Sequence, residues 1–225
     1  MGGLVSQSFD VATATAWLRR FAERIAAEKE WLTELDSAIG DGDHGINMHR
    51  GMSAVDEELR SSGSGDQPAD LATLFKRTGM KLVSSVGGAS GPLYGTFFLR
   101  LAAATGDATS LDGPGLAQAF RAGCDGVMAR GKAALGEKTM LDALLPAADA
   151  FDAAIGEGGD DLADALKATA DAARTGREAT IPMLATKGRA SYLGDRSIGH
   201  LDPGAASSTL LLETLADAVA GSDGS

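Results

Sequence analysis

The sequence has one cysteine in 225 residues, few aromatic side chains and too few cations to balance its acidic groups. Because Cys124 has no second cysteine to pair with, no disulfide can form within the chain, which is typical of a reducing compartment. The formal net charge of -11 disfavours nucleic acids and anionic membranes as partners. No apolar run is long enough to span a membrane, and the first ten residues do not resemble a signal peptide. We therefore expect a cytoplasmic protein without nucleic-acid or membrane partners, in which Cys124 is a buried core residue.

Apolar residues recur every three or four positions along most of the chain, which predicts helices. The first predicted helix follows Asp10, a good N-cap residue, and others span about 70–86 and 162–177. No segment alternates with a period of two for long enough to predict a strand. The pattern indicates eight helices in all. We therefore predict an all-α fold, an antiparallel bundle in one domain over residues 1–225.

The connections between the predicted helices are of two kinds. The first, third, fifth and seventh carry Asp, His, Ser, Lys, Thr, Arg and clustered Gly, whereas those at 61–68, 106–115 and 156–160 are plain spacers. Alternate connections lie at the same end of an up-and-down bundle. The four unusual connections should therefore meet at one rim, which we expect to be the active end.

The first connection, over residues 35–47, concentrates carboxylates. Asp41 and Asp43 alternate with glycines, which allow a tight turn, and Asp36 lies near the end of the preceding helix. Three like charges this close repel one another, and a hard cation such as Mg²⁺ would relieve the repulsion. The alternative is a solvated Gly/Asp turn, which explains most such sequences.

Other segments of this rim are compatible with phosphate binding. The run Gly87–Gly91 opens a predicted helix, where backbone N–H groups can face an anion, although small residues also allow tight helix packing. Arg189 is a fork-shaped donor suited to phosphate. Asp202 before Pro203 is equally typical of a helix cap. His44, His200 and Lys138 each have an ordinary structural or solvated interpretation as well. The chain matches neither a dinucleotide fingerprint, a P-loop nor an EF-hand, because the required strand or spacing is missing.

Four segments together resemble the L subunit of bacterial dihydroxyacetone kinase: residues 35–48, 84–95, 138–140 and 187–205. The resemblance extends along nearly the whole chain. It implies an antiparallel eight-helix barrel that holds ADP or ATP and two Mg²⁺ ions at one rim. The implied metal ligands are Asp36, Asp41 and Asp43. The implied nucleotide contacts are His44, Gly45, Ile46, Asn47, Ala89, Ser90, Gly131, Met140, Arg189, Asp202, Pro203 and Gly204. No residue of this chain is assigned a catalytic role.

The resembled family has two branches, and the quoted segments look like the free-subunit branch. In that branch bound ADP is rephosphorylated by a phosphohistidine protein of the sugar phosphotransferase system, and dihydroxyacetone is held on a separate K subunit. Three alternatives stay open: direct use of ATP, another small ketose as substrate, and a non-catalytic nucleotide-binding module that docks on a transcriptional regulator. A homodimer is also left open.

Overall fold

The computed structural model describes residues 8–61, 67–156 and 161–221, so the first residues and most of the predicted spacers at 61–68 and 156–160 lie outside it. Within these ranges the chain forms nine α-helices, one 3₁₀ segment and two short strands. In chain order the elements are β1 (Phe9–Asp10), α1 (Val11–Ala27), α2 (Lys29–Ile39), α3 (His44–Ser61), α4 (Leu71–Ser85), α5 (Ser90–Thr105), β2 (Ser110–Leu111), α6 (Gly113–Gly131), α7 (Leu141–Gly156), α8 (Leu162–Ala179), η1 (Arg189–Ser197) and α9 (Pro203–Ala220).

The predicted all-α fold is confirmed, whereas the helix count differs slightly. The first predicted helix is divided at Glu28, whose backbone leaves the helical region (φ -98°, ψ 11°), so α1 and α2 are separate. The 3₁₀ segment η1 forms within the last unusual connection. β1 and β2 pair antiparallel with Phe9 opposite Leu111, but two residues are too few to produce a sequence period. Among the described helices, none combines the length and apolar character needed to cross a bilayer.

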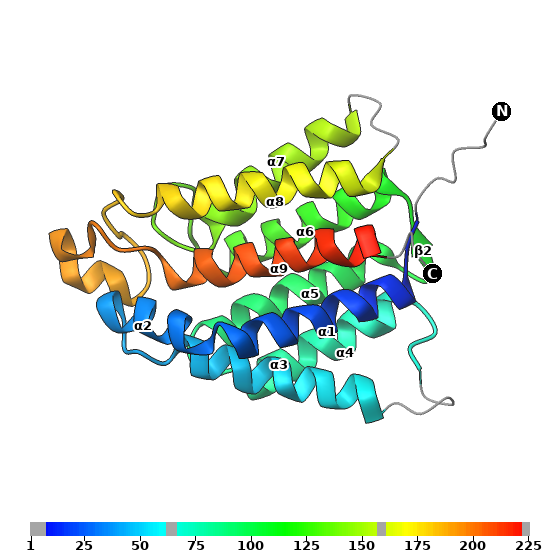
Figure 1. Ribbon diagram of the computed structural model, residues 1–225, viewed down its shortest axis with the longest axis horizontal. Coiled ribbons are helices and arrows are strands. Elements are labelled where there is room, and N and C mark those ends of the chain that lie inside the picture. The colour runs from blue at the N-terminus through cyan, green and yellow to red at the C-terminus, as the bar shows by residue number, and fades with distance from the viewer. Residues whose placement is uncertain (1–7, 62–66, 157–160, 222–225) are drawn as a thin grey trace.

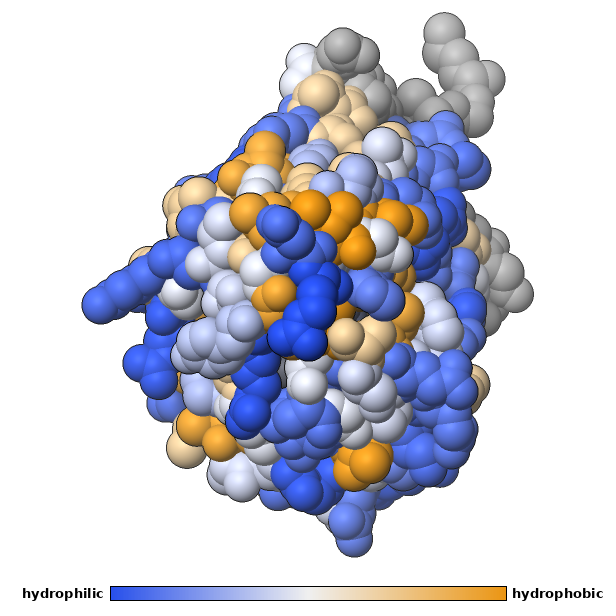
Figure 2. All heavy atoms as spheres, turned by 90° about the vertical axis from the view of Figure 1, so that its left-hand side faces the viewer, coloured by the Kyte–Doolittle hydropathy of each residue, from blue (hydrophilic) through white to orange (hydrophobic). Residues whose placement is uncertain are grey.

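The helices lie side by side along one common direction (Figure 1), and their contacts close them into a ring. From α3 to α9 each helix packs against the next, and α9 returns to α1, which in turn packs against α3. The connections after α2, α4, α6 and α8 lie at the left-hand end in Figure 1, opposite β2 and the last turn of α9. Figure 2 looks directly onto this end, where hydrophilic side chains occupy the centre of the face. The four unusual connections therefore lie at one rim, as the alternation along the sequence predicts, and the described C-terminal ends of α3, α5 and α7 lie at the opposite rim.

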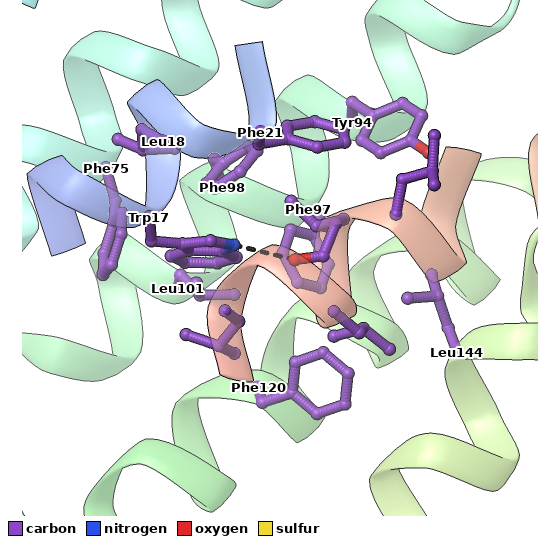
Figure 3. Packing of buried hydrophobic residues seen from close by; sticks show 14 of the residues in the cluster. Trp17, Leu18, Phe21, Phe75, Tyr94, Phe97, Phe98, Leu101, Phe120 and Leu144 are labelled. Atoms are coloured by element: carbon purple, nitrogen blue, oxygen red, sulfur yellow. Dashed lines mark hydrogen bonds between the residues drawn. The ribbon is translucent and has the colours of Figure 1, made fainter. Parts of the chain in front are cut away.

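An aromatic core holds α9 in its place in the ring, between α8 and α1. Trp17 of α1 packs against Phe75 and Phe98, with ring centroids 6.1 and 5.7 Å apart. Its indole N–H donates to the backbone carbonyl of Leu211, 2.8 Å away in the middle of α9 (Figure 3). Cys124 is buried in the same core, and burial raises the pKa of its thiol, so the expected core role is confirmed. Because α9 is held along its length, its N-terminus is fixed at the active rim.

Candidate functional site

One cavity of about 190 Å³ at the active rim is lined by residues from all four unusual connections. Its wall includes the first residues of three helices, His44 of α3, Ser90 of α5 and Pro203 of α9, and Met140 directly before α7. A larger hollow of about 490 Å³ lies between α1 and α3, but Glu23, Asp56 and Arg60 on its wall are ordinary surface charges. Side-chain chemistry, and not volume, therefore identifies the rim cavity as the site.

Four helix N-termini face this cavity. The first N–H groups of a helix have no partner within the helix, and the helix dipole places partial positive charge there. A site where several N-termini meet is therefore suited to an anion such as phosphate. This arrangement follows from the antiparallel ring, because α3, α5, α7 and α9 all begin at the same rim.

The three predicted carboxylates lie together at one side of the cavity. Ligand oxygens of Asp36, Asp41 and Asp43 lie within 4.8 Å of one another. Asp36 is buried at the end of α2, and its Oδ2 accepts the backbone N–H groups of Asp43 (2.8 Å) and His44 (3.1 Å). The turn passes through Gly42 at φ 74°, a conformation that favours glycine. An all-oxygen donor set of this size fits Mg²⁺.

His44 connects three helices through its ring. Nδ1 lies 3.1 Å from the Ser90 hydroxyl of α5, and Nε2 lies 2.9 Å from the Ser207 hydroxyl of α9. Burial lowers the pKa of His44 to about 4, although Asp36 and Asp43 act in the opposite direction. The ring is therefore neutral at physiological pH and works through hydrogen bonds.

Lys138 is buried, so its interpretation as a solvated loop charge is wrong. Its ammonium group donates to the backbone carbonyls of Thr180, Ile181 and His200. An ammonium has three hydrogens, so the group has none left for a phosphate. Burial lowers the pKa of Lys138, and the nearby Asp202 and Asp142 oppose that shift. Lys138 thus joins the connection before α7 to the one before α9.

Two buried aspartates cap the helices that begin at this wall. Asp202 accepts the N–H of Ala205 at 2.7 Å, with Pro203 in the first turn of α9, so the predicted cap is confirmed. Burial raises the pKa of Asp202 to about 7. Asp142 accepts the N–H of Thr139 at 2.7 Å and also that of Gly136, which shapes the loop before α7.

Most of the predicted site residues meet in the cavity. The lining set comprises Asp36, Asp41, Asp43, His44, Ala89, Ser90, Met140, Arg189, Asp202, Pro203 and Gly204. Four other predicted contacts do not line it. Gly45 packs on α2, where an added Cβ would lie 2.1 Å from the Lys29 carbonyl, and Asn47 accepts a hydrogen bond from Arg50. Ile46 is half exposed, and Gly131 lies at the end of α6. Their nucleotide contacts stay predictions.

Several residues of the site are absent from the sequence-based set. Tyr94 lines the cavity, whereas Ser207, Asp142 and Thr180 support its wall from behind. Single hydroxyls inside apolar helices give no pattern that separates them from ordinary helix residues. Asp142, in contrast, is an acidic residue in the first turn of an otherwise apolar helix, which is a recognisable capping signal.

Comparison with known proteins places the chain in a family. The DAK2 domain model matches residues 38–217. The chain is 47% identical over 208 residues to the ADP-binding subunit DhaL of PEP-dependent dihydroxyacetone kinase 1 from Listeria innocua, covering 92% of this chain and 96% of that one. It is 48% identical over 200 residues to the corresponding subunit from Escherichia coli K12, covering 89% and 93%. A D-erythrulose kinase from Mycolicibacterium smegmatis is 34% identical, and the match covers 35% of its length.

The fold has a counterpart among solved structures. The dihydroxyacetone kinase of C. freundii, in complex with AMP-PNP and Mg²⁺, superposes with a TM-score of 0.68 at 24% identity, covering 96% of this chain and 36% of that one. This likeness concerns the fold alone. The family model spans most of the chain, and the bacterial subunits are nearly half identical to it over almost their whole length. The chain therefore belongs to the DAK2 domain family, among the L subunits of bacterial dihydroxyacetone kinases.

Proposed function

We propose that this chain is the ADP-binding subunit of a PEP-dependent dihydroxyacetone kinase and uses the rim cavity for phosphoryl transfer. The observation that carries the proposal is the convergence of four helix N-termini beside the Asp36, Asp41 and Asp43 cluster. N-termini suit phosphate oxygens, and the carboxylates suit the cations that accompany them. The names of the bacterial relatives agree with this chemistry.

The residues of the cavity would bind two different parts of a magnesium nucleotide, the metal ion and the phosphates. Asp36, Asp41 and Asp43 would hold Mg²⁺ as ligands and would not act as general bases. Backbone N–H groups at Ser90 and at the start of α9 would donate to phosphate oxygens, and Arg189 would add a planar pair of donors at the cavity mouth. Bound Mg²⁺ supplies charge neutralisation and alignment, which are the main requirements of phosphoryl transfer. The number of ions, two by resemblance, stays a prediction.

The proposal includes two protein partners. A K subunit would hold dihydroxyacetone, and a phosphohistidine protein of the phosphotransferase system would recharge the bound ADP, which places the reaction in the cytoplasm. The segments around the cavity expose apolar side chains that such partners can cover, among them Ile46, Leu184 and Tyr192, the last 88% exposed. A homodimer and contact with a transcriptional regulator stay predictions from the resemblance.

Nucleotide retention tests the cofactor role. A nucleotide that serves as a cofactor must outlast many transfer cycles, whereas a substrate leaves after each one. The purified protein should release ADP on denaturation. With a K subunit present, ATP alone should give little sustained phosphorylation of dihydroxyacetone, and adding a phosphohistidine donor should restore turnover. A protein that purifies empty and turns over many times on free ATP would contradict this role.

A second candidate is an ATP-dependent kinase for a small ketose, favoured by the erythrulose kinases among the relatives. Those proteins are about three times as long as the matched region, whereas the match to the Listeria subunit spans 96% of its length. Comparing dihydroxyacetone and erythrulose as acceptors, each with ATP and with the phosphohistidine donor, separates the two candidates. A non-catalytic regulatory module would transfer phosphate to neither acceptor under any of these conditions.

A further inference from the structure

A chain of hydrogen bonds runs from the cavity wall into the barrel behind it. The hydroxyl of Ser90 contacts Nδ1 of His44 (3.1 Å), and Nε2 of that ring contacts the hydroxyl of Ser207 (2.9 Å). Ser207 also contacts the hydroxyl of Tyr94 (2.7 Å), which contacts Ser208 (3.1 Å). Figure 3 shows Tyr94 with its hydroxyl directed towards α9. Ser207 and Ser208 are fully buried, so water does not reach either side chain.

Counting hydrogens along this chain gives one self-consistent direction for each bond. The hydroxyl of Ser207 also lies 3.2 Å from the carbonyl of Gly204, which can only accept, so Ser207 donates there. Ser207 must then accept from both of its other partners, the Tyr94 hydroxyl and Nε2 of His44. Tyr94, having donated to Ser207, accepts from Ser208. A neutral ring with its hydrogen on Nε2 accepts at Nδ1, so Ser90 donates to His44. Every hydrogen is used once in this assignment.

We propose that Ser207 is a positioning residue that selects the Nε2–H tautomer of His44 and thereby orients Ser90 in the nucleotide cavity. The role in nucleotide binding rests on the proposed function, whereas the tautomer does not. Ser90 has its hydroxyl hydrogen committed to His44, so it serves a phosphate through its backbone N–H at the start of α5. The His44 ring also sets the spacing between the N-termini of α3, α5 and α9, since it is bonded to the other two helices.

Ser208 provides a matched control for Ser207. The two serines are adjacent in α9, are fully buried and both bond to Tyr94, but only Ser207 contacts His44. Ser207→Ala removes the acceptor for Nε2–H. Ser207→Cys keeps nearly the same volume while replacing the hydroxyl with a weak acceptor, so it separates the hydrogen bond from packing. Ser208→Ala removes an equally buried hydroxyl without touching the ring.

Two measurements are required. Nitrogen NMR of the imidazole in ligand-free protein reports the tautomer, and calorimetry with Mg²⁺ and ADP reports binding. Wild type and Ser208→Ala should both show His44 protonated at Nε2. Ser207→Ala and Ser207→Cys should lose that preference and bind Mg²⁺–ADP about tenfold more weakly, as expected when a group that orients a site residue is removed. Thermal unfolding of the same variants separates this loss from a loss of fold.

Three results would overturn the proposal: a wild-type ring protonated at Nδ1 or at both nitrogens, an unchanged tautomer in both Ser207 variants, or equal binding by the Ser207 and Ser208 variants. The tautomer is measured in ligand-free protein, so this measurement does not depend on nucleotide binding. If the wild-type protein did not bind Mg²⁺–ADP, the proposed function would be wrong, but the assignment of the tautomer could still be correct. If Ser207→Ala does not fold, the wild-type signal and Ser207→Cys still decide the matter.

Discussion

The guanidinium of Arg189 lies 3.0 Å from the carboxylate of Asp41 at the mouth of the cavity. One of these groups is expected to bind a phosphate and the other a cation, so without ligands they neutralise each other. Both side chains are substantially exposed, at 67% and 36%, and an exposed pair of this kind contributes less than about 1 kcal/mol. A magnesium nucleotide can therefore separate them at little cost and give each group a more highly charged partner.

Removing one carboxylate charge should abolish metal-dependent nucleotide binding. Asp41→Asn or Asp43→Asn should weaken Mg²⁺–ADP binding at least about 100-fold in calorimetry, because a neutral amide is a poor ligand for a hard cation. Both variants should keep the helical fold. Asp43→Asn should be no less stable without metal, since repulsion within the cluster falls, whereas Asp41→Asn also loses its ion pair with Arg189. Asp217→Asn, at an exposed position of α9, is the matched control. If Asp41→Asn and Asp43→Asn bound Mg²⁺–ADP as tightly as wild type, these aspartates would not be the metal ligands.

Arg189→Lys tests the planar donor pair. Lysine keeps the charge but presents a point charge where arginine presents two parallel N–H groups, so phosphate-transfer activity should fall about tenfold. Arg60→Lys is the control, because Arg60 also pairs with an aspartate on the surface, Asp56 at 2.7 Å, away from the cavity. Equal activity of the two variants would show that Arg189 is only a surface charge.

Lys138→Met should destabilise the protein. It removes a donor that three backbone carbonyls at the active rim share. The carbonyls of Thr180 and Ile181 keep the backbone N–H groups of Met183 and Gly199, whereas that of His200 loses its ammonium partner, so the free energy of unfolding should fall by about 1–3 kcal/mol. Lys132→Met is a close control, since Lys132 also has a positive φ, 48° against 61°, but is exposed. Urea denaturation measures the free energy of unfolding of both variants. A similar, small decrease in the two variants would mean that the hydrogen bonds of Lys138 contribute little to stability.

Asp202 should make stability depend on pH. Its folded pKa of about 7 lies above the usual 3.8, so the folded protein holds this proton more tightly than the unfolded chain does. The stability of wild type relative to Asp202→Asn should therefore fall as pH rises from about 4 to 7, by at most about 4 kcal/mol. Asparagine can still cap α9, which isolates the charge. The measurement is the free energy of unfolding of the two ligand-free proteins, determined by urea denaturation at several pH values across this range.

A second helix cap should give stability a pH dependence of the opposite sign. Asp70 caps α4, and the backbone N–H of Thr73 lowers the pKa of its carboxyl. Stability relative to Asp70→Asn should therefore rise with pH through the acid range, where Asp70 loses its proton, and stay level above it. If the stability of wild type relative to the Asn variant changed with pH in the same direction at both caps, the raised pKa could not be assigned to Asp202.

The sequence alone was sufficient for the features that depend on short-range spacing. Apolar residues three or four positions apart determine the helices, and the alternation of plain and polar connections places the active rim. Asp36, Asp41 and Asp43 lie within eight positions, so their cluster is nearly a local property. The cap by Asp202 is local as well, since the carboxylate reaches Ala205 three residues on.

Only the tertiary structure decided how distant residues meet. Lys138 looks like a loop charge until packing buries it against a carbonyl 62 positions away, and His44 bonds to Ser207 across 163 positions. Burial and such long-range contacts depend on where the ring closes, with α9 between α8 and α1, and no spacing in the sequence encodes that closure. The carboxylate cluster could therefore be named from the sequence, whereas the network that orients it became visible only once the helices were packed.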